Sequence, residues 1–183
     1  MKPIALTTLV LLASTAILTA QNKGAGAPTT SPIFSTVRQM ETRFAKNLTG
    51  AADTMPADKY SYRPTPEQIT FGHLMMHTAE ANNSLCAAAA GEQPKEVKLS
   101  DTDTKEVLSK AVADSFAYCE QMLSKADEGT LGQAASLPGG RTTTRGGVLV
   151  SMVANWADHY SMAAMYLRLN NLTPPSAQKP AGK

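Results

Sequence analysis

The sequence has few charged residues, few aromatic residues and almost no excess charge of either sign. Of its 183 residues, 17% are charged and 5% are aromatic, and 17 basic residues face 15 acidic residues. Lys2 lies in an N-terminal segment that we expect to be removed, which leaves the mature chain nearly neutral. A neutral chain lacks the basic surface that nucleic acid binding requires. Hydrophobic residues make up 43% of the chain, which suits one compact domain and excludes wholesale disorder.

Several catalytic motifs are also missing. The chain has no HExxH zinc-protease motif, no P-loop, no GxGxxG and no GxSxG. Ser84 and Ser151 have no motif around them, so a serine nucleophile is unsupported. Any function must therefore come from isolated residues that the fold brings together.

The longest apolar run is confined to the N-terminus. It extends from Ile4 to Leu18 behind the single cation Lys2, which is the layout of a secretory signal. The run is shorter than the roughly 20 apolar residues of a membrane-spanning helix. We expect residues 1–20 to be a cleavable signal peptide, with cleavage after Ala20 or after Ala16, and the protein to be exported to the periplasm or outside the cell. An uncleaved membrane anchor is the alternative.

The rest of the chain shows helical periodicity and no run of alternating β-branched residues. Residues 21–30 read as a flexible linker and residues 174–183 as a disordered tail, so the folded domain is expected at residues 31–173. Each of four segments carries an apolar stripe with a spacing of three and four residues. The expected helices run from Ser31 to about Gly50, from Thr65 or Thr70 to Ala90, from Asp101 or Asp103 to about Gly129, and from about Thr144 to Asn170. The predicted fold class is therefore all-α, a four-helix bundle.

The only two cysteines, Cys86 and Cys119, lie on the second and third expected helices. They sit at one level if these helices run parallel. In an antiparallel pair they are displaced by about a dozen residues, roughly 18 Å at about 1.5 Å per residue. A disulfide tolerates Cα separations of up to about 7 Å. A bridge therefore requires a parallel pair, and two buried free thiols remain the alternative.

Three histidines lie on the expected helices. His73 and His77 are four residues apart and share a face of the second helix, while His159 lies four residues after Asn155 on the fourth. Imidazole is a common ligand of zinc and nickel, and bundle interiors often build metal sites from facing helices. A lone histidine on an apolar stripe is more often a half-buried core residue, so spacing alone does not establish a metal site.

Three segments resemble the DinB-like superfamily of metalloproteins. The first, Met55–Glu67, reads MPADKYSYRPTPE, and the second, Phe71–Asn82, reads FGHLMMHTAEAN. The third combines Asp158-His159-Tyr160 with the later YLRLN and PPS motifs. The resemblance covers about residues 37–176, with its motifs in the family's order and spacing.

The resemblance implies an up-down-down-up bundle, in which the second and third helices are parallel, and a zinc or nickel ion held by three histidines. By position, His77 is the first ligand and His159 the third. Asn155 stands where the family has the second histidine, which weakens the expected site. His73 takes the place of a residue that is usually acidic and is a candidate substitute ligand.

Relatives of this kind include thiol-dependent isomerases and thiol S-transferases. We therefore expect an exported, divalent-metal-binding protein with metal-dependent hydrolase or thiol-transferase-type activity. The alternative is a non-catalytic bundle with a degenerate metal site that binds a small ligand or a partner. The expected partner is a small molecule, without nucleic acid and without stable membrane insertion after signal cleavage; homodimer formation stays open.

Overall fold

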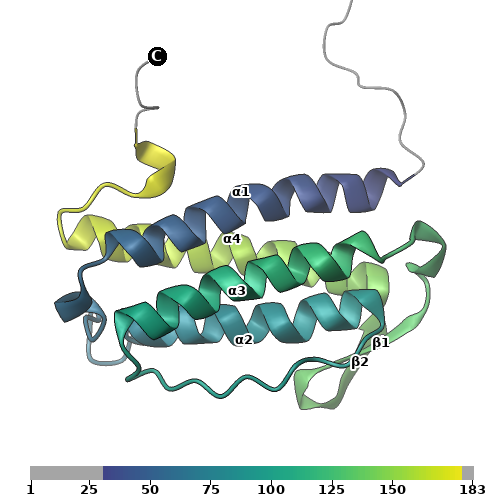
Figure 1. The fold of residues 1–183 in the computed structure, drawn as a ribbon, viewed down its shortest axis with the longest axis horizontal. Coiled ribbons are helices and arrows are strands. Elements are labelled where there is room, and N and C mark those ends of the chain that lie inside the picture. Colours follow the sequence, from purple (N-terminus) through teal and green to yellow (C-terminus); the bar gives the residue numbers. More distant parts are fainter. Residues whose placement is uncertain (1–30, 179–183) are drawn as a thin grey trace, which may run out of the picture.

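The computed structural model describes residues 31–178, so the expected signal peptide and linker, and the last residues of the tail, lie outside the described part (Figure 1). Within it, four long helices form a bundle, as the all-α prediction requires. They are α1 (Pro32–Thr54), α2 (Phe71–Ala90), α3 (Lys105–Ser124) and α4 (Arg145–Leu169). None of the helices among the described residues has the length and hydropathy needed to span a bilayer.

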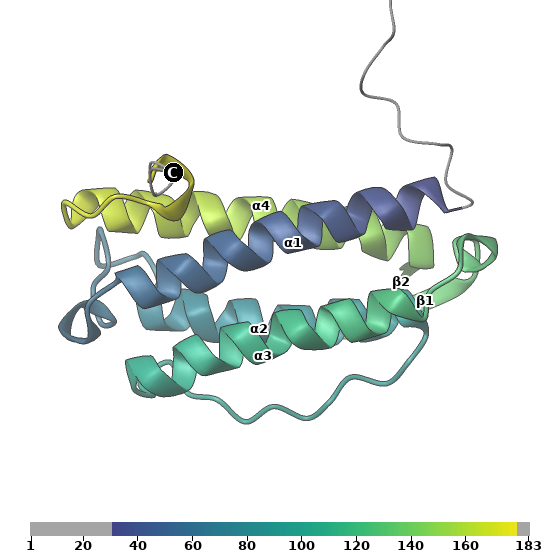
Figure 2. The same ribbon diagram turned by 45° about the horizontal axis from the view of Figure 1, so that its top comes forward.

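Helix direction follows from the long connection between α2 and α3. Residues 91–104 run back along the length of the bundle, so α3 starts at the same end as α2 and runs parallel to it (Figures 1 and 2). Helices α1 and α4 run the opposite way. Helix α1 packs against both α3 and α4, and so does α2. Seen along the bundle axis, the four helices therefore form a closed ring in the order α1, α3, α2, α4. The groove between α2 and α4 and the groove between α1 and α3 therefore lie on opposite sides of the bundle.

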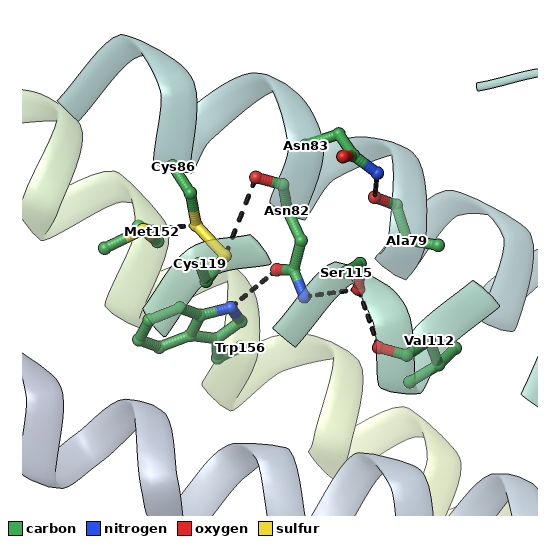
Figure 3. The surroundings of a disulfide bond; sticks show 9 residues. All are labelled: Ala79, Asn82, Asn83, Cys86, Val112, Ser115, Cys119, Met152 and Trp156. Carbon is green, nitrogen blue, oxygen red and sulfur yellow. Dashed lines mark hydrogen bonds between the residues drawn. A yellow bond between two sulfur atoms is a disulfide. The ribbon is translucent and has the colours of Figure 1, made fainter. Parts of the chain in front are cut away.

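A disulfide joins the parallel pair. Cys86 and Cys119 are bonded, with their Cα atoms 5.1 Å apart, which confirms the bridge that the sequence left open (Figure 3). Met152 of α4 places its Sδ atom 3.3 Å from Cys86 Sγ. The bridge is thus enclosed where α2, α3 and α4 meet, because both cysteines and Met152 are fully buried.

A buried polar network lies one turn from the disulfide. Trp156 Nε1 donates to Asn82 Oδ1 (2.7 Å), and Asn82 Nδ2 donates to Ser115 Oγ (3.0 Å). Ser115 Oγ in turn donates to the carbonyl of Val112 (2.8 Å) (Figure 3). Every member has a partner, so the core keeps these polar groups at little cost and links three helices at one level.

The expectation of no strand is wrong for the segment before α4. Strands β1 (Ala134–Leu137) and β2 (Arg141–Thr144) form an antiparallel hairpin in which Ala134 pairs with Thr144. The turn is made by Gly139 and Gly140, whose φ angles of 77° and 75° favour glycine. Strands of four residues are too short to show a convincing alternation in sequence.

Helix starts differ from the expected ones at α3. Thr104 caps this helix, its side chain accepting from the amide of Val107. Asp101 and Asp103 were expected to cap it, but Asp103 accepts from the amide of Ser100 and Asp101 faces His73. Both carboxylates are therefore engaged before the helix begins, and α3 also ends earlier than expected, at Ser124.

Helix α2 begins at the second of its two candidate starts, because Thr70 Oγ1 accepts from the amide of His73 (3.0 Å). Helix α1 begins after Ser31 with Pro32 in its first turn, as expected. Spacing of three and four residues predicts Ile33, Val37, Phe44 and Leu48 on its buried face. The last three are buried, but in the first turn Phe34 is fully buried and Ile33 is 49% exposed.

Residues 174–178 differ from the expected disordered tail. Pro175–Ala177 form a short 3-10 helix that packs against α1. The amide of Ser176 donates to the hydroxyl of Tyr160 on α4 (2.9 Å), and this hydroxyl donates to Ser176 Oγ (2.7 Å). Contacts with α1 and with Tyr160 of α4 therefore order a segment whose composition alone suggests disorder.

Candidate metal and ligand site

The structure brings His77 of α2 and His159 of α4 together. Their ring centroids are 5.1 Å apart and the ring planes are inclined by 58°. His159 is 5% exposed, whereas His77 is exposed at the surface of the groove between the two helices. A solvent-accessible imidazole next to a buried one leaves an open side for a ligand to enter.

Thr78 determines which nitrogen of His159 carries the proton. The Thr78 hydroxyl donates to the carbonyl of Leu74 (2.7 Å), so its oxygen can only accept from His159 Nδ1, which lies 3.2 Å away. Nδ1 therefore carries the hydrogen, and Nε2 keeps its lone pair. Metal-binding histidines are commonly held by a hydrogen bond of this kind at their other nitrogen.

Asn155 lies against the remaining nitrogen of the same ring. Its Nδ2 is 3.3 Å from His159 Nε2 and donates to the lone pair. The Asn155 Oδ1 atom is buried and has no hydrogen-bond partner in the described part of the chain. A buried amide oxygen without a partner is costly unless something else, such as a bound ligand, supplies a donor or a cation.

Burial keeps the His159 ring neutral. Its desolvation is the main cause, and the nearby His77 adds to it, so the pKa of His159 falls from 6.5 to about 4, although Asp158 opposes the shift. The neutral form is the one that binds metal ions. The buried ring is therefore a free base at physiological pH.

His73 does not join the pair. Its Nδ1 lies 3.3 Å from Asp101 Oδ2 in a partly exposed pair, with 38% and 47% of the two side chains accessible. The contact ties the first turn of α2 to the segment before α3. His73 therefore serves a local contact, and it does not line the pocket next to His77.

A pocket of about 350 Å³ opens beside the pair. His77 and Asn155 form one part of its wall, and Arg141 of the hairpin forms another. Its remaining lining residues all come from α2: Glu80, Ala81, Ser84 and Leu85. Sequence reasoning missed Glu80, although its position three residues after His77 places it on the same face. It also missed Arg141, for which no signal existed once the hairpin was overlooked.

The donor set is incomplete for a strong metal site. Among residues 31–178, no three histidine, cysteine, aspartate or glutamate side chains are grouped closely enough to hold a metal ion. The protein offers two imidazoles, and the amide of Asn155 stands at the position where the resemblance places the second histidine. Two imidazoles and an amide are weaker ligands for a divalent ion than three histidines would be.

Comparison with known proteins agrees with the fold. The family model described as the DinB superfamily matches residues 41–163. A DinB-like protein from Bacillus cereus superposes with a TM-score of 0.63 at 16% identity, covering 77% of this chain and 95% of its own. A DinB-like protein from Bacillus subtilis gives 0.60 at 18% identity, covering 78% and 99%. No curated protein matches the sequence.

A mycothiol-dependent maleylpyruvate isomerase is also similar in fold. It superposes with a TM-score of 0.58 at 16% identity over 70% of this chain. The alignment covers 59% of that enzyme, so the enzyme has a large part with no counterpart in the aligned region. At 16% identity, the similarity between this chain and that enzyme concerns the fold alone.

Proposed function

Because the chain belongs to the DinB superfamily, we propose that it binds a divalent metal ion, zinc or nickel, at His77 and His159. The observation that carries the proposal is the fixed ring of His159. Its Nδ1 hydrogen is committed to Thr78, so Nε2 carries the lone pair, and the ring centroid lies 5.1 Å from that of His77. A neutral imidazole beside a second histidine suits a borderline metal ion.

Each residue of the site has a distinct role in this proposal. His77 and His159 are the ligands. The amide of Asn155 can rotate by half a turn, which would bring its unpartnered Oδ1 to the groove as a weak third donor. Glu80, Ser84 and Arg141 surround the space where a small molecule would lie. When bound, the ion would lower the pKa of a coordinated water or thiol, the chemistry of hydrolases and thiol transferases.

A second function is favoured by one observation. Asn155 Nδ2 donates to the very lone pair that a metal would need. A bundle that has lost the metal would keep this hydrogen bond and use the pocket for a small organic ligand.

The proposal includes export. The Cys86–Cys119 disulfide supports it, because such bonds persist in oxidising compartments. The expected signal peptide lies outside the described residues, so N-terminal sequencing of the protein recovered from the periplasm or medium is the direct test.

Metal analysis of the purified mature protein tests the site. We expect near-stoichiometric zinc or nickel, lost in His77→Ala and in His159→Ala. His73→Ala is the matched control, because this histidine is on the same helix but pairs with Asp101, and its metal content should equal that of the wild type.

The variant Asn155→His separates the two functions. If the wild type binds metal weakly, the added imidazole should tighten binding by about tenfold or more. A wild type without metal that gains it only as Asn155→His supports the second function. Failure of both proteins to bind zinc or nickel would exclude the metal site altogether.

A further inference from the structure

A second hollow lies on the opposite side of the bundle, between α1 and α3. Its volume is about 360 Å³. Small side chains make the room, since Ala45 of α1 faces Ala113 and Ala117 of α3. Glu41 and Glu120 stand beside these alanines. No part of the histidine site contributes to this hollow.

Glu41 is the unusual residue of this groove. It lies on the buried stripe of α1 between Val37 and Phe44 and is only 6% exposed. In the described part of the chain its carboxyl group forms no hydrogen bond and no ion pair. The carboxyl oxygens are not fully buried and reach the hollow, so a proton or a cation can compensate the partly desolvated carboxylate from that side.

The surrounding charges do not compensate Glu41. Desolvation, followed by the negative charge of Glu120, raises the pKa of Glu41 from 4.5 to about 7. The other charged group on the groove wall is Lys46, which is exposed and forms no ion pair in the described residues. The groove therefore presents two carboxyl groups and a single solvated cation.

The other polar atoms of the groove are acceptors as well. Thr42 Oγ1 donates its hydrogen to the carbonyl of Arg38 (3.0 Å), and Thr49 Oγ1 donates to that of Ala45 (2.6 Å). Both hydroxyl oxygens are left with lone pairs only. Phe116 adds an apolar wall. An acceptor-rich hollow with an aromatic wall matches a cation that carries several N–H donors and an alkyl chain.

We propose that the groove between α1 and α3 binds a small organic amine, whose ammonium group lies between the carboxylates of Glu41 and Glu120. The alkyl part of the amine would pack against Phe116 and the alanines. A hard divalent cation fits less well, since calcium takes six to eight oxygen ligands and much of this wall is apolar. The hollow is large enough for a molecule of a few heavy atoms.

Calorimetric titration of the full mature chain with n-butylammonium chloride at pH 8 tests the proposal. We expect saturable binding that weakens about tenfold or more in Glu41→Gln and severalfold in Glu120→Gln. Glu67→Gln, which changes an exposed glutamate outside the groove, is the matched control and should bind within about twofold of the wild type. Binding should also weaken from pH 8 to pH 6, as Glu41 takes up a proton.

Two outcomes would overturn the amine site: no saturable binding by the wild type, or equal binding by Glu41→Gln. Calcium chloride is titrated in parallel, and saturation by calcium without any by butylammonium would overturn the assignment to an amine. If Glu41→Gln does not fold, NMR replaces it. Added butylammonium should shift the backbone amide signals of residues 113–120 in the wild type, and Glu120→Gln should lose these shifts; unshifted signals in the wild type would overturn the amine site. His77→Ala should bind the amine normally, which keeps this test independent of the metal site.

Discussion

Thr78 Oγ1 and His159 Nδ1 are 3.2 Å apart and join α2 to α4 inside the bundle. The contact does more than satisfy a buried polar atom. Because the threonine hydroxyl donates to the carbonyl of Leu74, it fixes the hydrogen of the imidazole on Nδ1 and leaves the lone pair on Nε2, to which Asn155 donates. The orientation of the site therefore depends on a residue that never touches a ligand.

Thr78→Val should weaken zinc binding by about 10- to 100-fold while the bundle stays folded. Valine has the size of threonine but accepts no hydrogen bond, so the His159 ring loses its fixed orientation. Thr78→Ser, which keeps the hydroxyl, should recover most of the affinity. Competition with a chromophoric chelator measures both variants. Equal affinities in Thr78→Val and the wild type would show that this hydrogen bond does not orient the ring.

Removal of the disulfide should lower the free energy of unfolding by about 3–4 kcal/mol. The bond closes a loop with a sequence separation of 33 residues, and its loss frees the unfolded chain. The double variant Cys86→Ala/Cys119→Ala, compared with the wild type in urea titrations, measures the effect. Thiol titration of the denatured wild type is the control, and two reactive thiols there would contradict the bond itself.

Asn82→Leu should cost about 2–3 kcal/mol of stability, because it leaves the indole N–H of Trp156 without an acceptor and removes the hydrogen bond that Asn82 donates to Ser115 Oγ. Asn83→Leu is the matched control. Asn83 is also buried, but its amide bonds only to the carbonyl of Ala79 in its own helix, so a change of about 1 kcal/mol or less is expected.

A double-mutant cycle tests the Asn82 network further. If the unpaired indole is the main cost, Asn82→Leu should be less harmful in a Trp156→Phe background. Strict additivity of the two substitutions in thermal or urea unfolding would argue that Asn82 and Trp156 act independently.

Glu41 should make the protein less stable as the pH rises. Its folded pKa of about 7 lies above the ordinary 4.5, so the folded state holds a proton that the unfolded state has lost. The resulting stability is fully present below about pH 4.5 and disappears as the pH rises through 7. Its size is on the order of 1–3 kcal/mol.

The comparison that isolates this effect is the wild type against Glu41→Gln, unfolded in urea at several pH values. Between pH 5 and pH 8 the wild type should lose free energy of unfolding relative to Glu41→Gln, because glutamine does not titrate. A difference that stays constant over this range would mean that Glu41 ionises as freely in the folded chain as in the unfolded chain.

Local sequence was enough to predict the four helices. Spacing of three and four residues is a property of one helix, and it placed His77 and His159 on the second and fourth helices before any packing was known, whereas their role as ligands stays a prediction drawn from the DinB-like motifs. The cysteine positions showed that a bridge requires a parallel helix pair, and the structure contains both. The DinB-like motifs supplied the direction of the helices, which periodicity alone does not contain.

Other features depend on the tertiary contacts that each helix makes in the folded chain. The burial of Phe34 instead of Ile33 in the first turn of α1 depends on packing that helical spacing does not contain. The Thr104 cap follows from the engagement of Asp101 by His73. The hairpin that brings Arg141 to the pocket is too short to have a periodicity of its own.

The sequence by itself thus determined which segments are helical and which imidazoles share a bundle, because helical period and chain spacing are local quantities. Only the tertiary structure decided that Thr78 orients His159, that His73 pairs elsewhere, and that Glu41 is buried opposite Glu120. Hydrogen-bond partners and desolvation come from residues distant in the chain, and no local pattern encodes them.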